Sequence, residues 1–151
     1  TEPLRFMTNA NQFEGVQGWL IRRLGAFPVD LNRPTVSSLR CAVESLQAGR
    51  KLVMFPEGGI VRDQVLRPIK PGLARLVLQA EAKMPQDVTI PIVPIAIRYN
   101  PGADLCARIV IHISPPLYLQ EYRRENDKQT ALALTQALQT ALLKSLERIE
   151  G

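Results

Sequence analysis

Residues 51–59 read Lys-Leu-Val-Met-Phe-Pro-Glu-Gly-Gly, and this stretch decides the fold class. Its first five residues predict a short buried strand of an α/β sheet, because the run is mostly apolar and is bounded by turn residues. Pro56 ends the strand, since proline has no N–H to donate to a ladder. Gly58 and Gly59 then allow a close backbone approach to a ligand. Glu57 is therefore expected at the C-terminal end of the strand, where α/β sheets bind ligands.

The rest of the chain alternates between helical and extended patterns. Apolar residues at steps of three or four predict helices, whereas short apolar or alternating runs predict strands. The expected helices cover residues 13–24, 35–48, 72–82 and 130–149, and the expected strands cover residues 26–29, 52–55, 90–98 and 108–113. Strand 52–55 is expected at the centre of the sheet, and two prolines make strand 90–98 irregular or place it at an edge. This order predicts an α/β fold with a mixed, partly parallel sheet flanked by helices.

The length and composition are those of one globular domain. A chain of 151 residues with 46% apolar residues is expected to fold as a single domain, residues 1–151. No apolar run is long enough to span a bilayer. Cys41 and Cys106 lack metal-ligand spacing, no ligand cluster predicts a metal, and two free thiols are favoured over a disulfide. These features favour a reducing, cytoplasmic location.

The positive charge of the chain is concentrated around residues 51–59. The net charge is +5, and residues 22–83 carry 11 lysines and arginines against 5 acidic residues. This balance favours a phosphate-bearing ligand or an anionic lipid surface. An ordinary solvated basic face is the alternative. Binding of nucleic acid is disfavoured, because the chain lacks interleaved aromatic residues and any nucleic-acid-binding motif.

Four segments between residues 4 and 98 together resemble the glycerophospholipid acyltransferases. Phe55–Gly58 matches the start of the family's third sequence block, Phe-Pro-Glu-Gly-Thr-Arg, and Val93–Ile97 matches the fourth block, an apolar Val-Pro strand. Gly25–Asp30 matches part of the second block, Gly-x-x-x-Val-Asp-Arg. Lys70–Arg75 resembles the link from the third block into the next helix. Each segment alone is a weak signal, but their order and spacing agree with the family.

The resemblance implies a glycerol-3-phosphate acyltransferase-like fold and an enzyme of phospholipid biosynthesis. Such an enzyme moves a fatty acyl group from acyl-CoA or acyl carrier protein to the hydroxyl of a lysophospholipid or glycerol phosphate. The thioester is a co-substrate, so no bound cofactor is implied. The resemblance also implies a protein that is peripheral to the membrane on its cytoplasmic side and contacts an anionic membrane surface.

The family's first block, His-x-x-x-x-Asp, is absent from the chain. In the family its histidine is the general base and its aspartate orients the imidazole. The only histidine is His112, which lies in an apolar run without an aspartate five residues later, and we expect a structural role for it. The chain is therefore expected to be the C-terminal two-thirds of an acyltransferase domain, with the catalytic block upstream of Thr1 and no catalytic residue of its own.

The chain also departs from the family at the arginines thought to hold the acceptor phosphate. Leu31 stands where the second block has arginine, and Ile60 stands where the third block has arginine. We expect Arg33, Arg62 and Lys70 to supply the charge instead, since a guanidinium fork suits phosphate. These departures and the missing block leave an alternative function, a degenerate, non-catalytic module that binds lipid or an anionic membrane.

The resemblance assigns two further sets of residues. Glu57 and Gly58 are expected to bind the acceptor, although Glu57 alternatively caps the following segment. Val93, Pro94 and Ile95 are expected to shape an acyl-chain groove, although sheet core is the simplest interpretation of their apolar character.

The helix expected over residues 13–24 also has two interpretations. Val16, Leu20, Ile21 and Leu24 share the side expected to be buried. A core helix with a wet basic edge is favoured. An interfacial patch formed by Trp19, Leu20, Arg22 and Arg23 is the alternative.

Overall fold

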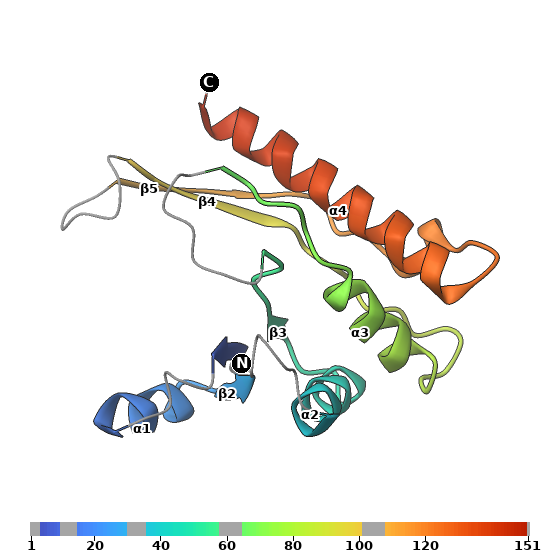
Figure 1. Ribbon diagram of the computed structural model, residues 1–151, viewed down its shortest axis with the longest axis horizontal. Coiled ribbons are helices and arrows are strands. Elements are labelled where there is room, and N and C mark those ends of the chain that lie inside the picture. Colours follow the sequence, from blue (N-terminus) through green and yellow to red (C-terminus); the bar gives the residue numbers. More distant parts are fainter. Residues whose placement is uncertain (1–3, 10–14, 30–35, 58–64, 101–107, 151) are drawn as a thin grey trace.

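The computed structural model describes residues 4–9, 15–29, 36–57, 65–100 and 108–150 (Figure 1). In chain order the elements are β1 Arg5–Asn9, α1 Gly15–Arg23, β2 Ala26–Val29, α2 Val36–Gln47, β3 Leu52–Val53, α3 Gly72–Glu81, β4 Ile95–Asn100, β5 Arg108–Ile113, a 3-10 helix Leu119–Tyr122 and α4 Asp127–Glu150. Helices and strands alternate through the first two-thirds of this order, which confirms the α/β class.

The described strands form two sheets. β1 lies between β2 and β3 in a three-stranded parallel sheet, in which Phe6 is opposite both Ala26 and Val53. β4 and β5 form an antiparallel pair in which Ile95 is opposite Ile113. Parallel and antiparallel pairing therefore both occur, as the sequence predicts.

The strand before the Glu57 turn differs from the prediction. Among the described residues, Leu52 and Val53 pair with β1, so β3 lies at an edge of the parallel sheet rather than at its centre. Both side chains are half-buried, and Phe55, beyond the paired residues, is 68% exposed. The expectation of a buried central strand is wrong. β1 takes the central place, and its short run with polar residues at both ends lacks a clear strand pattern.

Strand 90–98 is irregular, as its prolines predict. β4 begins only at Ile95, after Pro91 and Pro94. Ile92 makes a separate bridge to Leu117, with backbone hydrogen bonds of 2.9 and 2.8 Å. Proline has no N–H for the ladder, so regular pairing starts after the second proline.

Gly25 fixes the turn between α1 and β2. Its N–H donates to the Arg22 carbonyl oxygen at 3.1 Å, which confirms that it closes the first helix. Its φ is 89°, and a Cβ built there would lie 2.7 Å from the backbone oxygen of Leu4. Glycine alone accepts both the left-handed conformation and this close approach. The turn between α1 and β2 therefore lies directly against Leu4, the residue before β1.

α4 packs on α3 and covers one face of the β4–β5 pair (Figure 1). The principal core cluster comprises Ile69, Ala74, Val77, Leu78, Ile92, Leu119, Ala131, Leu134, Leu138 and Leu142. Three of these leucines recur at steps of four on α4, as predicted. The helix begins at Asp127, earlier than expected, because the Asn126 side chain accepts the Gln129 N–H at 2.9 Å.

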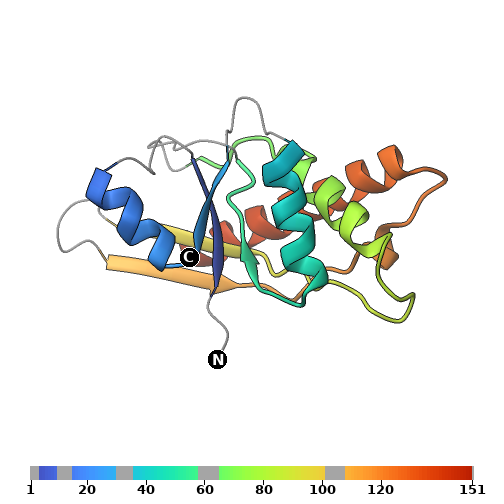
Figure 2. The same cartoon turned by 90° about the horizontal axis from the view of Figure 1, so that it is seen from below.

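A second cluster joins α2 to α3 through Ala42, Val43, Leu76 and Ala80. Met7 and Leu52 of the parallel sheet pack against it. α3 therefore contributes to both clusters and connects the parallel sheet to α4. In Figure 2 the strands β1 and β2 lie between α1 and α2.

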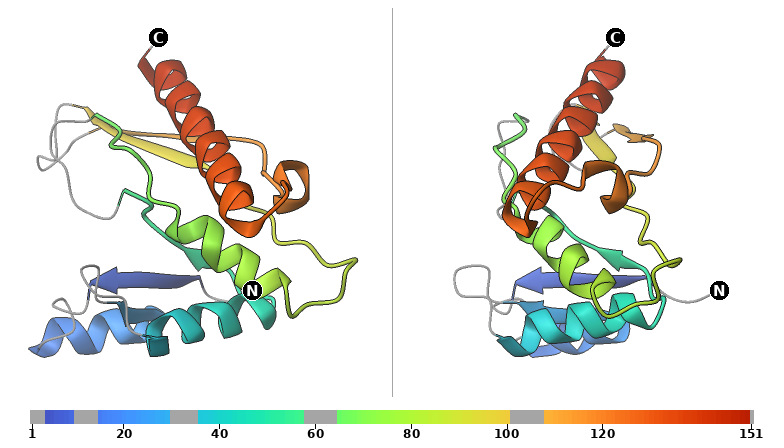
Figure 3. Two further views of the ribbon diagram at one scale, coloured as in Figure 1. Left: turned by 45° about the vertical axis from the view of Figure 1, so that its right-hand side comes forward. Right: turned by 90° about the vertical axis from the view of Figure 1, so that its right-hand side faces the viewer.

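α1 leaves exposed two of the apolar residues that the sequence predicts to be buried, Leu20 and Leu24. Trp19, Leu20 and Leu24 are 58%, 52% and 63% exposed. Ile21, a member of the predicted side, is half-buried and Gly18 is buried, so these two residues form the contact side in the described part of α1. In both views of Figure 3, α1 lies on the side of β1 away from α4. The interpretation of α1 as a core helix with only a solvent-exposed basic edge is wrong for the described structure.

Candidate functional site

The Glu57 turn follows directly from the end of β3. Pro56 and Glu57 form the turn, and the Glu57 side chain is half-buried. Its Oε2 accepts a hydrogen bond from the backbone N–H of Arg67 at 3.2 Å. The Lys70 N–H lies 3.5 Å from the Pro56 carbonyl oxygen. The segment from Arg67 to Lys70 therefore runs back along the turn and fixes the Glu57 carboxylate.

The same segment is held to the core on its other side. Ile69 is buried, and its N–H donates to Oε1 of Gln139 on α4 at 3.4 Å. Lys70, the next residue, is exposed. The backbone of Lys70 thus returns to the Glu57 turn, as its predicted site role requires.

Sequence reasoning missed the part that Arg67 plays. This residue is exposed, and its backbone N–H contacts Glu57. A backbone donor has no signature in the sequence, since every residue except proline carries one. The contact also gives Glu57 a loop-stabilising role, which is close to the capping role that the sequence left open.

The other residues predicted to hold the acceptor cannot be placed. Arg33, Gly58 and Arg62 lie outside the described residues, as do Leu31 and Ile60. Their assignments stay predictions, so Glu57 and Lys70 alone represent the predicted acceptor site in the described structure.

The predicted acyl-groove residues lie on two different faces. Val93 and Ile95 are 46% and 48% exposed, whereas Pro94 is buried. The exposed side continues along both strands as an outer apolar face, which comprises Val93, Ile95, Ile97, Tyr99, Ile109, Ile111 and Ile113. Its members are cross-strand neighbours, because the register pairs Ile97 with Ile111 and Tyr99 with Ile109.

His112 lies on β5, opposite Ala96 in the register. Its neighbours Ile111 and Ile113 belong to the outer apolar face, so alternation places His112 on the other face. The Nδ1 atom is buried and has no hydrogen-bond partner in the described part of the chain. A histidine base needs a partner to orient its imidazole. This geometry favours the structural role expected for His112.

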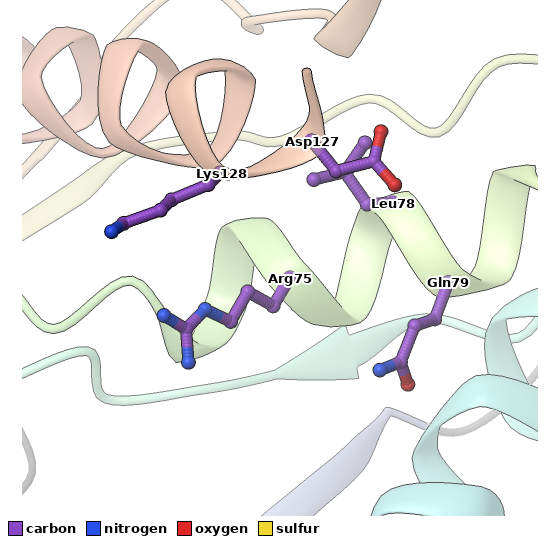
Figure 4. A pocket seen from close by; sticks show the side chains of 5 residues that line it. All are labelled: Arg75, Leu78, Gln79, Asp127 and Lys128. Atoms are coloured by element: carbon purple, nitrogen blue, oxygen red, sulfur yellow. The ribbon is translucent and has the colours of Figure 1, made fainter.

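An open hollow of about 240 Å³ lies between α3 and the start of α4 (Figure 4). It is lined by Arg75, Leu78, Gln79, Asp127 and Lys128. The Arg75 and Lys128 side chains extend the same way, whereas the Asp127 carboxylate lies at the other side of the hollow. None of these residues was predicted for the site.

Three further observations concern metals, thiols and membranes. Within the described ranges, no group of three or more His, Cys, Asp or Glu side chains is placed to hold a metal ion. Cys41 is a half-buried free thiol, and Cys106 lies outside these ranges. No described helix is both long and apolar enough to cross a membrane.

The sequence profile of the Acyltransferase family matches residues 1–98. The chain belongs to the acyltransferase family. The matched residues include the Glu57 turn, Lys70 and the Val93–Ile95 segment, so the family match covers every described residue predicted for the site. The resemblance to glycerophospholipid acyltransferases is thereby confirmed.

Two curated relatives are similar over most of this chain. The 1-acyl-sn-glycerol-3-phosphate acyltransferase of Streptococcus pneumoniae (strain ATCC BAA-255 / R6) is 27% identical over 133 residues, which cover 85% of this chain and 47% of that protein. The enzyme of the same name from Bacillus subtilis (strain 168) is 27% identical over 133 residues, which cover 86% of this chain and 61% of that protein. The chain thus spans about half the length of the curated relatives it matches.

A solved acyltransferase shares the fold. The crystal structure of the 1-acyl-sn-glycerophosphate (LPA) acyltransferase PlsC from Thermotoga maritima matches with a TM-score of 0.71 and 18% identity. The match covers 97% of this chain and 57% of that chain. The expected acyltransferase-like α/β fold is therefore confirmed over nearly the whole chain.

Proposed function

We propose that the protein containing this chain transfers a fatty acyl group to the free hydroxyl of a lysophospholipid, with 1-acyl-sn-glycerol-3-phosphate as the first candidate. The observation that carries the proposal is the family match over residues 1–98, which includes the Glu57 turn. The names of the two curated relatives support this acceptor. Acyl-CoA or acyl carrier protein is the proposed donor.

Glu57 is proposed to position the acceptor. Its carboxylate is half-buried and is already held by the Arg67 N–H at 3.2 Å. A carboxylate fixed in this way orients a substrate hydroxyl without a large loss of side-chain entropy. Gly58 is proposed to allow the acceptor to approach the backbone.

Lys70, Arg33 and Arg62 are proposed to hold the acceptor phosphate. The Lys70 backbone lies against Pro56, next to Glu57, and its side chain is exposed. A cationic group beside a carboxylate that positions the hydroxyl suits a phosphomonoester, because the hydroxyl and the negatively charged phosphate of such an acceptor lie close together. Arg33 and Arg62 are proposed from the sequence alone.

The acyl chain is proposed to lie along the outer apolar face. Val93 and Ile95 are exposed at the start of this face and lie in the segment that the family profile matches. Pro94 is buried between them, so its proposed role is to shape the strand rather than to contact the chain. Isoleucine side chains in a cross-strand row offer an apolar support for a hydrocarbon.

The general base is proposed to come from residues outside this chain. The only histidine is His112, and its Nδ1 is buried without a hydrogen-bond partner among the described residues, which supports a non-catalytic role. In the proposed reaction the base removes the acceptor hydroxyl proton as the oxygen attacks the thioester carbonyl carbon. The carbon–sulfur bond then breaks, and the thiol leaves with a proton. Alone, this chain is therefore proposed to be the C-terminal two-thirds of one acyltransferase domain and to be inactive.

The location is proposed to be the cytoplasmic side of a membrane, in peripheral contact with an anionic lipid surface. The proposed donors are cytoplasmic thioesters, whereas the proposed acceptor resides in a membrane. The basic balance of residues 22–83 supports an anionic surface.

The test uses the full-length protein with lysophosphatidate and an acyl thioester. Glu57→Gln is expected to lower acyl transfer on the order of 10²-fold, because the acceptor loses its position. Glutamine still accepts the Arg67 N–H, so the turn is retained. Glu147→Gln, at an exposed position on α4, is the control and is expected to leave transfer unchanged.

A second candidate function is a non-catalytic lipid-binding module. The changed residues Leu31 and Ile60 and the absence of the His-x-x-x-x-Asp block favour it. Full-length protein that binds lysophosphatidate but transfers no acyl group from either donor would establish this alternative and exclude the enzyme.

A further inference from the structure

One face of α1 carries exposed apolar and basic side chains, here named the α1 patch: Trp19, Leu20, Arg22, Arg23 and Leu24. No acidic residue lies between Gly15 and Leu24. The patch therefore combines exposed apolar side chains with two arginines, in a segment whose sequence contains no acidic residue. This combination is typical of helices that lie in a membrane interface.

Trp19 and Arg23 form a pair within the patch. The guanidinium carbon of Arg23 lies 4.8 Å from the centroid of the Trp19 ring, which is a cation–π contact one helical turn apart. At a lipid surface the indole ring suits the boundary between headgroups and acyl chains. A guanidinium held on the ring would then lie at the level of the phosphates.

Leu20 and Leu24 form a second pair one turn apart, and the Leu24 N–H donates to the Leu20 carbonyl oxygen at 3.1 Å. The helix is not free to turn these residues inward. Gly18 and Ile21 form its contact side, and Gly25 closes the helix against the backbone of Leu4. The patch is therefore presented outward by a fixed helix.

We propose that the α1 patch docks on an anionic lipid surface, with Trp19, Leu20 and Leu24 at the headgroup boundary and Arg23 at the lipid phosphates. The partner follows from charge complementarity. Residues 15–24 contain arginines and no acidic residue, and the patch overlaps the basic part of the sequence, residues 22–83. The inference rests on the proposed function in one respect, namely that the acceptor is a membrane lipid. Docking by α1 keeps the protein at the surface where such an acceptor resides.

Trp19 is the only tryptophan of the chain, so its fluorescence reports on the patch directly. The 151-residue chain is mixed with vesicles of equimolar phosphatidylcholine and phosphatidylglycerol, and separately with phosphatidylcholine alone. We expect a blue shift and quenching by brominated acyl chains with the anionic vesicles only. Added salt is expected to weaken the binding, since it screens the arginine–phosphate attraction.

Two variants separate the apolar and the basic contributions in vesicle co-sedimentation. The double variant Leu20→Ser/Leu24→Ser is expected to lower vesicle affinity by at least about tenfold through lost apolar burial. Arg23→Glu is expected to lower it by about fivefold or more, since one basic residue near an anionic surface contributes about 1 kcal/mol. Leu143→Ser and Lys144→Glu alter exposed residues of the same types on α4 and are expected to leave affinity unchanged.

The proposal is overturned if anionic vesicles leave Trp19 fluorescence unshifted, if the α1 variants bind as tightly as the unmodified chain, or if the α4 controls lose as much affinity. A change of self-association in the α1 variants with unchanged vesicle binding would identify a second copy as the partner instead. Acyl transfer by the full-length protein in detergent micelles tests the proposed function separately. If the unmodified chain does not bind anionic vesicles while the full-length protein transfers acyl groups in micelles, the docking is overturned and the proposed function is retained.

Discussion

Replacing Gly25 with alanine is expected to destabilise the 151-residue chain strongly. The φ of 89° lies in the left-handed region, which costs an alanine about 1–2 kcal/mol. The added Cβ would also lie 2.7 Å from the backbone oxygen of Leu4. No side chain can rotate away from this clash, so the start of β1 or the α1–β2 turn must shift. Together the two effects are expected to lower the free energy of unfolding by about 2–4 kcal/mol.

Two other glycines separate the effect of φ from the effect of the clash. Gly49 has a φ of 72°, but nothing lies within 4 Å of a Cβ built there, so Gly49→Ala carries the conformational cost alone, about 1–2 kcal/mol. Gly72 opens α3 with open space around its Cβ position and no positive φ. Gly72→Ala is expected to leave stability unchanged or to raise it by up to about 1 kcal/mol.

The measurement is urea unfolding followed by far-ultraviolet circular dichroism for all three variants. The expected order of stability is Gly72→Ala, then Gly49→Ala, then Gly25→Ala. A Gly25→Ala variant as stable as Gly49→Ala would refute the close approach of the α1–β2 turn to Leu4. If the slope of the free energy of unfolding against urea concentration is the same in all variants, the differences between them are differences in stability alone.

Further expectations concern a buried hydroxyl pair, the thiols and the phosphate site. Ser145→Ala is expected to cost about 1 kcal/mol, because its Oγ lies 2.6 Å from that of Ser114 in a part-buried contact; Thr140→Ala, at an exposed position, should cost less. Thiol titration under denaturing, non-reducing conditions is expected to find Cys41 and the second cysteine free, and a count of zero would contradict this. In the full-length protein Arg62→Ala is expected to weaken acceptor binding by roughly ten- to a hundredfold with little effect on the donor. Equal loss for both substrates would indicate misfolding.

The sequence predicts the helices of this fold better than its sheets. α3 and α4 bury repeated stripes such as Leu134, Leu138 and Leu142, and such a stripe defines both the element and its inner face. α1 has a similar apolar spacing at Leu20 and Leu24, yet it exposes both residues. Periodicity alone therefore identifies a helix without stating whether a neighbour covers its apolar side.

Strand pairing depends on contacts that are distant in the sequence. β1 becomes the central strand because it meets β2 and β3 at Phe6, and its own five residues carry no sign of this place. The apolar run before Pro56 gives the clearest strand pattern, yet only Leu52 and Val53 join the ladder. A strong local pattern therefore located the turn and its carboxylate correctly but not the position of the strand in the sheet.

In the candidate site, too, some residues can be predicted from local motifs, whereas the contacts that hold them involve residues distant in the sequence. Glu57 and Lys70 could be predicted from their motifs, which belong to the matched residues 1–98. What holds them together is the backbone of Arg67 and the buried Ile69, whose N–H reaches Gln139 on α4. Ile69 also belongs to the core cluster that the α4 leucines build. The helix beyond the family match therefore helps to position the Glu57 turn. The proposed acceptor site would then depend on the packing of α4 as well as on the family's own sequence blocks.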